Sequence, residues 1–294
     1  MQKSNLKNHL HLHIIVFIWG FTAVLGKLIT INAVPLVWFR LSIAAVILYF
    51  VLVIKKINYK INRKALIQFA ISGFIIALHW IAFFYAIKIS NVSITLATLA
   101  TGALFTSLLE SFFLKTKFKV YEILLSLLTI IGIVIIYDVE TQYSLGIIVA
   151  LIAAFLSALF AVLNAGFVKD HDSRVLTFYE LLFAVLLISV IILFQDGFSA
   201  KFFNLSTNDW IYIIILASVC TAYALTASTK LLKKISAFTM MLTVNLEPVY
   251  GIILALIVFG SDEEMSSSFY YGAIFIFAGV ILNVIIKSKI NKKE

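Results

Sequence analysis

Ten long apolar stretches follow one another along the chain and leave little sequence between them. They cover residues 10–31, 35–54, 66–87, 92–114, 121–137, 145–168, 175–194, 210–229, 236–259 and 269–286. An α-helix needs about 20 apolar residues to cross the hydrocarbon core of a bilayer. Runs such as VLLISVIILF do not alternate in polarity as the strands of a membrane β-barrel do. The sequence therefore predicts an all-α integral membrane protein with ten transmembrane helices.

The composition excludes several other classes of protein. Hydrophobic residues make up 63% of the chain and charged residues 13%, whereas soluble domains have roughly half and a quarter. A single cysteine excludes a disulfide scaffold, and alternation places His9, His11 and His13 on different helix faces, so no metal site is expected. The net charge of +9 is not gathered on one water-facing surface, so no nucleic-acid partner is expected. The first stretch lacks a small-residue cleavage pattern and is expected to remain in the protein.

The lysines and arginines predict the orientation in the membrane. When both termini lie on one side, nineteen Lys and Arg residues fall on that side, and two, Lys88 and Lys201, fall on the other with seven acids. Cytoplasmic loops carry the excess of positive charge. We therefore expect a multi-pass protein of the cell (plasma or inner) membrane with both termini cytoplasmic and a basic tail over 288–294. The same charges favour contact with anionic lipid headgroups, so membrane lipid is an expected partner.

The two halves of the chain resemble each other. Three pairs of segments match in order: LHIIVFIWGFTAVLGK with LGIIVALIAAFLSALF, WFRLSIAAVIL with FYELLFAVLLI, and AIKISNVSITLATLA with LLKKISAFTMMLTVN. The second pair places Arg40 opposite Glu180. Each half, 1–138 and 145–287, contains five predicted spans, so the second half must enter the membrane inverted. Inverted repeats are typical of secondary transporters, whose site lies near the bilayer midplane between the halves.

Several residues resemble a known family. The Trp19-Gly20 pair with Lys27, Pro35, Phe39-Arg40 and LEPVYGIILALIVFG at 246–260 are similar to the EamA family of the drug/metabolite transporter superfamily. The resemblance covers both halves. It implies ten helices in two inverted five-helix repeats around a central cavity, and export of amino acids or related metabolites. Gly102 and Lys115 depart from the family pattern, which often has a proline and an acidic residue there.

Five Lys, Arg or Glu residues lie away from the ends of the predicted spans: Lys27, Arg40, Glu110, Glu180 and Glu247. Each would cost about 2.5–3.5 kcal/mol if it faced lipid, so all are expected to face the protein interior or water. At 1.5 Å per residue, Arg40 and Lys27 lie toward the outer side, Glu180 and Glu110 toward the inner side, and Glu247 near the middle.

We interpret these positions as a polarised cavity that binds a zwitterion. Arg40 can bind a carboxylate through two parallel hydrogen bonds, whereas Lys27 offers a point charge. Other interpretations remain open. Lys27 can extend to the outer headgroups, Arg40 can bond backbone carbonyls at a helix end, Glu110 can pair with the cytoplasmic lysines, and Glu180, a second-half polar contact, can pair with Arg174.

The Glu247-Pro248 pair lies in the middle of the ninth stretch. Proline removes a backbone hydrogen bond and weakens the helix. One interpretation is a gating hinge whose carboxylate contacts a substrate or proton, and the other is a structural kink beside a protonated glutamate. Gly102 in the fourth stretch is a second candidate hinge, although the spacing of Thr98, Gly102 and Thr106 also suits close helix packing.

Polar-tipped aromatic residues complete the predicted substrate site. His79 and Trp80, with Tyr85 and Trp19, lie at middle to outer depth. The histidine could relay protons, and the tryptophans could stack on a substrate, but packing roles remain open for all four residues.

The motifs of other functional classes are missing from the sequence. No G-x-x-x-x-G-K-[ST] run, H-E-x-x-H or G-x-S-x-G occurs, so neither ATP hydrolysis nor a cofactor is expected, and the chain is not expected to be an enzyme. We expect a secondary transporter that exports a small-molecule metabolite, an amino acid or related zwitterion, by alternating access. An intramembrane enzyme and a membrane scaffold or lipid-interacting protein are the alternatives. The oligomeric state is open, and a monomer is compatible with the sequence.

Overall fold

The computed structural model describes residues 2–114, 120–195 and 197–290, and every regular element in these ranges is helical. The helices are α1 (Gln2–Leu28), α2 (Ala33–Ile54), α3 (Arg63–Ile89), α4 (Val92–Leu99), α5 (Gly102–Leu114), α6 (Val120–Val139), α7 (Ser144–Phe167), α8 (Ser173–Leu193), α9 (Ala200–Phe203), α10 (Thr207–Ala217), α11 (Ala224–Leu231), α12 (Ala237–Val244), α13 (Glu247–Phe259) and α14 (Ser267–Ile290). Short 3-10 turns, η1 (Thr141–Tyr143) and η3 (Gly260–Glu263), and a π-helix, η2 (Ser218–Tyr223), join them. The all-α prediction is confirmed for the described residues.

Each of the ten predicted stretches coincides with one helix or with consecutive short helices. Seven helical stretches within the described ranges are long and apolar enough to cross a membrane. Two shorter apolar segments, 127–138 and 267–279, lie in α6 and α14. The chain is therefore a multi-pass membrane protein. Residues 291–294 of the predicted basic tail and Lys115 lie outside the described residues.

Two of the predicted stretches are interrupted at equivalent places in the two halves. The fourth stretch breaks between α4 and α5, and the ninth breaks between α12 and α13. Gly102 is the first residue of α5, and Pro248 lies in the first turn of α13, where its missing N–H costs little. The two broken helices pack on each other, α4 against α13 and α5 against α12.

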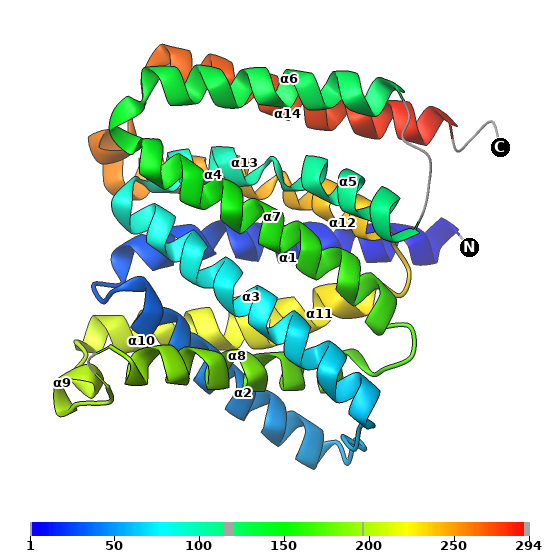
Figure 1. Ribbon diagram of the computed structural model, residues 1–294, viewed down its shortest axis with the longest axis vertical. Coiled ribbons are helices and arrows are strands. Elements are labelled where there is room, and N and C mark those ends of the chain that lie inside the picture. The colour runs from blue at the N-terminus through cyan, green and yellow to red at the C-terminus, as the bar shows by residue number, and fades with distance from the viewer. Residues whose placement is uncertain (1, 115–119, 196, 291–294) are drawn as a thin grey trace.

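The helices are arranged in layers along the longest axis of the molecule (Figure 1). α6 and α14 lie side by side at one edge of the molecule, and α2 packs against α8 at the opposite edge. Between these pairs, α3 packs on α7 and α8, and α1 packs on α13 and α11. The broken helices therefore lie inside the molecule, between the two edge pairs.

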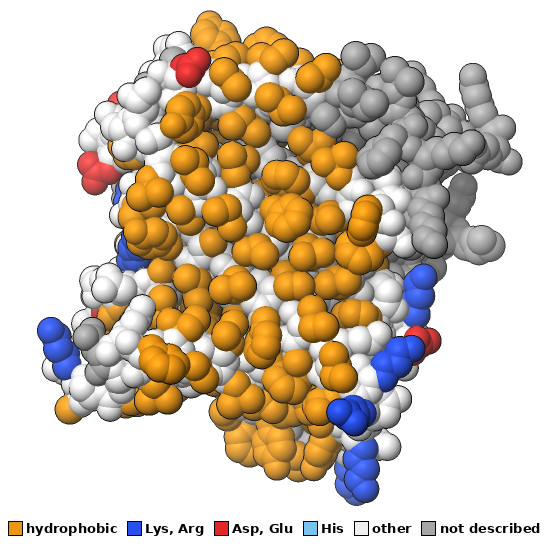
Figure 2. Space-filling view, in the orientation of Figure 1, with side chains coloured by type: hydrophobic (Ala, Val, Ile, Leu, Met, Phe, Trp, Pro, Cys, Tyr) orange, Lys and Arg blue, Asp and Glu red, His pale blue; other side chains and the backbone are white. Residues whose placement is uncertain are grey.

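The outer surface is apolar over a broad band. Figure 2 shows hydrophobic side chains covering the face between the two ends, and most of the visible Lys and Arg side chains gather at the end where α1 begins. Large apolar side chains such as Phe112 and Ile257 are 75% and 74% exposed. A soluble monomer rarely exposes apolar area on this scale, and such surfaces mark contact with membrane or protein.

Candidate functional site

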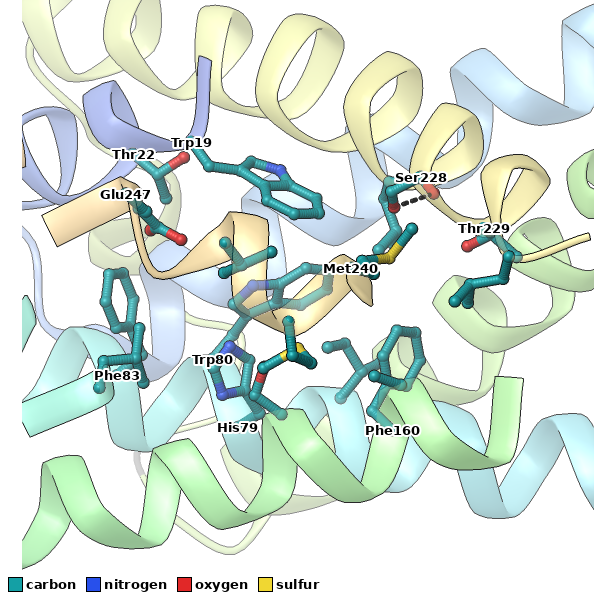
Figure 3. Close-up of a pocket in the computed structure, with 18 of the residues that line it drawn as sticks. Trp19, Thr22, His79, Trp80, Phe83, Phe160, Ser228, Thr229, Met240 and Glu247 are labelled. Carbon is teal, nitrogen blue, oxygen red and sulfur yellow. Dashed lines mark hydrogen bonds between the residues drawn. The ribbon is translucent and has the colours of Figure 1, made fainter. Parts of the chain in front are cut away.

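A cavity of about 90 Å³ lies between α1, α2, α3, α4, α7, α11, α12 and α13. One water needs roughly 10–15 Å³ by this measure, so the space holds several water molecules. Five of the predicted site residues line it: Trp19, Arg40, His79, Trp80 and Glu247. Figure 3 shows four of them, without Arg40, labelled around the cavity. The remaining walls combine apolar side chains, among them Phe83, Phe160, Met240 and Met241, with the hydroxyl groups of Thr22, Ser157, Ser228 and Thr229.

Arg40 is almost completely buried, with 1% of its surface exposed. Its Nε donates a hydrogen bond to Thr221 Oγ1 over 2.5 Å, and its guanidinium carbon lies 4.4 Å from the centre of the Trp80 ring and 5.5 Å from that of Phe84. Its Nη1 has no hydrogen-bond partner in the part of the chain that the structure describes. One edge of the guanidinium is therefore fixed, and a donor remains for a bound group.

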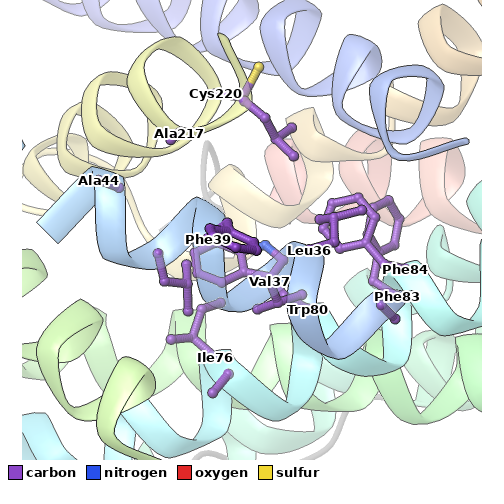
Figure 4. Close-up of a cluster of buried hydrophobic side chains, with 14 of the residues drawn as sticks. Leu36, Val37, Phe39, Ala44, Ile76, Trp80, Phe83, Phe84, Ala217 and Cys220 are labelled. Atoms are coloured by element: carbon purple, nitrogen blue, oxygen red, sulfur yellow. The ribbon is translucent and has the colours of Figure 1, made fainter. Parts of the chain in front are cut away.

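The rings beside Arg40 belong to an extensive apolar cluster. Trp80, Phe83 and Phe84 come from one side of α3 and pack with residues of α2 such as Leu36 and Phe39 (Figure 4). A stacked, desolvated cation–π contact is worth about 2 kcal/mol or more. The cluster thus stabilises the cation without neutralising it.

The π-helix η2 fixes two residues of the cavity at once. Thr221 Oγ1 accepts the Arg40 bond and donates to the Leu216 carbonyl over 2.8 Å, and the Cys220 carbonyl accepts a 3.1 Å hydrogen bond from Trp19 Nε1. Short π-helical turns inside α-helices are frequent at functional sites. The sequence carries no local signal for this feature, because the segment SVCTAY contains neither glycine nor proline.

Glu247 is the first residue of α13 and is 7% exposed. The first turn of a helix stabilises a carboxylate. The ion pairs among the described residues do not include Glu247. The cavity is therefore lined by a guanidinium and a carboxyl group that form no ion pair with each other.

His79 is held in one tautomer by the neighbouring helix. Its Nδ1 lies 2.8 Å from the Ala153 carbonyl oxygen, which can only accept a hydrogen bond, so Nδ1 carries the proton. In the neutral ring, Nε2 is then an acceptor. The ring also stacks on Phe83, with centroids 6.1 Å apart.

Two predicted site residues do not line this cavity. Lys27 lies at the end of α1, where its Nζ is 2.8 Å from Glu263 Oε1 and 4.3 Å from the centre of the Phe259 ring. Tyr85 is 45% exposed on α3. Both residues therefore lie apart from Arg40, because the buried Glu263 pairs with Lys27 and Tyr85 falls on the exposed face of its helix.

Glu263 lies in η3, in the connection between α13 and α14, and is fully buried. Its carboxylate accepts hydrogen bonds from the backbone N–H groups of Val92 and Ser93 over 3.0 and 2.9 Å, and from Ser93 Oγ over 2.8 Å. The first N–H groups of a helix lack internal partners, so Glu263 caps α4. No local pattern in the sequence links the segment before α14 to the start of α4.

Glu180 is buried outside the cavity in a polar cluster of its own. Its Oε1 accepts hydrogen bonds from Ser72 Oγ and, over 2.8 Å, from Asn164 Nδ2. The proposed alternative pair with Arg174 is wrong, because Arg174 Nη2 bonds Asp172 Oδ2 over 2.6 Å. Glu110 is half-buried on α5.

Gly102 and Pro248 flank the cavity without forming its walls. Gly102 begins α5, where an added Cβ would lie 3.1 Å from Met241 Cε, so the position is closely packed. Pro248 follows the cavity residue Glu247 directly. Both positions therefore lie where the broken helices meet the cavity.

The family model and the two relatives that match this chain are all described as transporters. The model of the EamA-like transporter family matches residues 8–138 and 144–285. The uncharacterized transporter YxxF of Bacillus subtilis is 24% identical over 77% of this chain and 72% of its own length. An uncharacterized transporter of Clostridium kluyveri is 24% identical over 70% of this chain and 68% of its own. A crystal structure of another protein, 12% identical, covers 97% of this chain and 98% of its own with a TM-score of 0.70, which indicates a shared fold.

Proposed function

Because the chain belongs to the EamA-like transporter family, we propose that this membrane transporter carries a small zwitterion, such as an amino acid, bound in its central cavity. The observation that carries the proposal is an arginine and a carboxyl group that line the cavity without an ion pair between them. Arg40 Nη1 lacks a partner, and Glu247 lines the same cavity outside any ion pair between described residues. A carboxylate and an ammonium group on one solute would complement both.

The proposal includes ten membrane helices in two inverted repeats of five. The family model matches each half once. The packing also supports it, because exchanging the halves preserves most of the contacts between helices. The contact of α1 with α13 corresponds to that of α7 with α4 and α5. The contact of α3 with α7 corresponds to that of α11 with α1. The α2–α8 and α6–α14 pairs each join a helix to its own equivalent in the other half.

Alternating access would use the two broken helices as hinges. The breaks before Gly102 and Glu247 occur at equivalent places in the halves, and the two broken helices pack on each other. Discontinuous helices at the repeat interface are typical of secondary transporters. No phosphate-binding loop for ATP occurs in the sequence. The distribution of Lys and Arg supports cytoplasmic termini in the cell membrane, and the family resemblance favours export.

Counterflow in proteoliposomes tests the function. We expect purified protein to exchange labelled amino acids, and Arg40→Ala to reduce exchange at least tenfold while the protein still inserts and purifies. Lys201→Gln, at an exposed lysine outside the cavity, is the matched control and should keep the wild-type rate. Wild-type exchange by Arg40→Ala would refute the role of Arg40. An intramembrane enzyme would instead form a product, and a scaffold would move no solute.

A further inference from the structure

A second and larger hollow, a groove of about 530 Å³, lies between α2, α8, η2 and α11, with His11 of α1 at its rim. It shares no lining residue with the central cavity. Its walls come from segments far apart in the sequence, which is why the sequence alone does not show it. Nothing in the proposed transport cycle uses this groove.

One end of the groove is strongly basic. Lys55, Lys230 and Lys233 are exposed there, and Arg174 lies beside them. The acid among the lining residues, Asp172, is bonded to Arg174, which lowers the pKa of Asp172 and keeps it ionised. The three lysines form no ion pair with any residue in the described ranges. An anion can therefore bind them without displacing a protein partner.

The other end of the groove is apolar on its α2 wall, whereas Ser218, Tyr223 and Thr226 lie on the facing wall beside Ala222 and Ala227. Ile47, Leu48 and Val51 lie on the face of α2 that ends at Lys55. At 1.5 Å per residue, Ile47 is about 12 Å from Lys55 along the helix. On the facing wall, Ala222 and Ala227 precede Lys230. The groove thus runs from a cationic mouth to an apolar floor, in the direction in which a lipid runs from headgroup to acyl chain.

We propose that this groove binds an anionic phospholipid, with its phosphate at Lys55, Lys230 and Lys233 and an acyl chain along Ile47, Leu48 and Val51. Basic pockets between transmembrane helices are known to bind the headgroups of anionic lipids. A free phosphate would leave the apolar floor uncovered. Phosphatidylcholine would bring its own cation next to the lysines. The inference does not depend on the identity of the transported solute.

Native mass spectrometry of the full-length protein in detergent tests the site. We expect phosphatidylglycerol to bind at least tenfold more tightly than phosphatidylcholine with the same acyl chains. The variant Lys55→Gln, Lys230→Gln, Lys233→Gln should reduce this preference to within twofold. The matched control, Lys56→Gln, Lys60→Gln, Lys64→Gln, removes the same charge from exposed lysines outside the groove and should keep it. If the triple variant does not purify, Lys230→Gln alone should still lower the preference severalfold.

The contribution of the acyl chain is tested separately. Phosphatidylglycerol with six-carbon chains and inorganic phosphate should each bind at least tenfold more weakly than the long-chain lipid. Equal binding of the two long-chain lipids, or equal losses in the groove and control variants, would overturn the proposal. Tight binding of inorganic phosphate that displaces the lipid would also overturn it and would make the groove a site for a soluble anion.

Discussion

At the scale of the residue, the burial of Arg40 is the main constraint on function. A charged side chain inside the membrane must find polar partners, and Arg40 has one firm hydrogen bond, to Thr221, and two aromatic faces. Its identity and depth could be predicted from the sequence, since charged residues in apolar stretches must face inward. Thr221 could not, because a threonine in an apolar stretch has many possible partners.

Thr221→Val tests whether that hydroxyl positions Arg40. The substitution keeps the shape of the side chain but removes the acceptor, and hydrogen bonds to charged groups contribute about 1.5–3 kcal/mol. We expect the KM for solute in the liposome assay to rise about tenfold or more, with the maximal rate less affected. Thr221→Ser, which restores the hydroxyl, should recover most of the affinity. If Thr221→Val and Thr221→Ser both express poorly, and the protein that can be purified has the wild-type KM, Thr221 has a structural role instead.

Glu247→Gln tests proton coupling. If the Glu247 carboxyl gains and loses a proton during transport, the amide variant cannot, and we expect its exchange rate to vary less with external pH than that of the wild type. The measurement is counterflow across a series of pH values. A pH profile identical to that of the wild type would exclude Glu247 as the coupling residue.

At the scale of the element, the breaks in the fourth and ninth predicted stretches govern how the helices can move. The Pro248 position and the Gly102 position were identified from the sequence, and the structure places both at the start of a new helix. The π-helix η2 was not identified, because a one-residue insertion in a helix leaves no mark in an apolar sequence. Glycine and proline positions that interrupt a helix can therefore be predicted from the sequence, but a π-helix that depends on tertiary packing cannot.

Pro248→Ala should slow transport at least fivefold without loss of stability. Alanine restores the backbone N–H and favours a continuous helix from α12 into α13, because it removes the block that proline imposes. Pro35→Ala is the control, since Pro35 also lies in the first turn of a helix, but the residues before α2, 29–32, are not helical, so alanine there cannot join two helices. Exchange rates of the two variants, compared with their thermal unfolding, provide the measurement. A wild-type exchange rate for Pro248→Ala would contradict the proposed hinge between α12 and α13.

The contact between α6 and α14 depends on glycine. A Cβ on Gly132 would lie 2.6 Å from the Gly272 carbonyl oxygen, which is backbone and cannot rotate away. Gly132→Ala should therefore destabilise the protein by about 1–3 kcal/mol, the usual cost of overpacking. Gly166→Ala, on α7 with nothing near its Cβ position, should be neutral or stabilising by up to about 1 kcal/mol. Thermal unfolding in detergent distinguishes the two substitutions, and equal midpoints would contradict the packing argument.

At the scale of the whole molecule, charge and apolar surface are arranged along one axis. The apolar stretches and the Lys and Arg distribution in the sequence were sufficient to predict the helices and an orientation. The burial of Glu263 and the convergence of Lys55, Arg174 and Lys230 were not predictable, because each depends on residues from separate parts of the chain.

The orientation can be tested with single cysteines. In a Cys220→Ser background, we expect Lys60→Cys to react with an impermeant maleimide only from the cytoplasmic side, and Lys201→Cys only from the outside. Both side chains are exposed, so the reagent can reach them. Labelling of both positions from the same side would reject the predicted topology.

The Lys27–Glu263 bond joins the end of α1 to the segment before α14, and so fastens the first half of the chain to the second. Glu263 also holds the start of α4, so parting the halves there would strip its carboxylate of several donors together, each worth about 1.5–3 kcal/mol. If the halves separate at this end during transport, we expect the breaking of these bonds to slow the cycle.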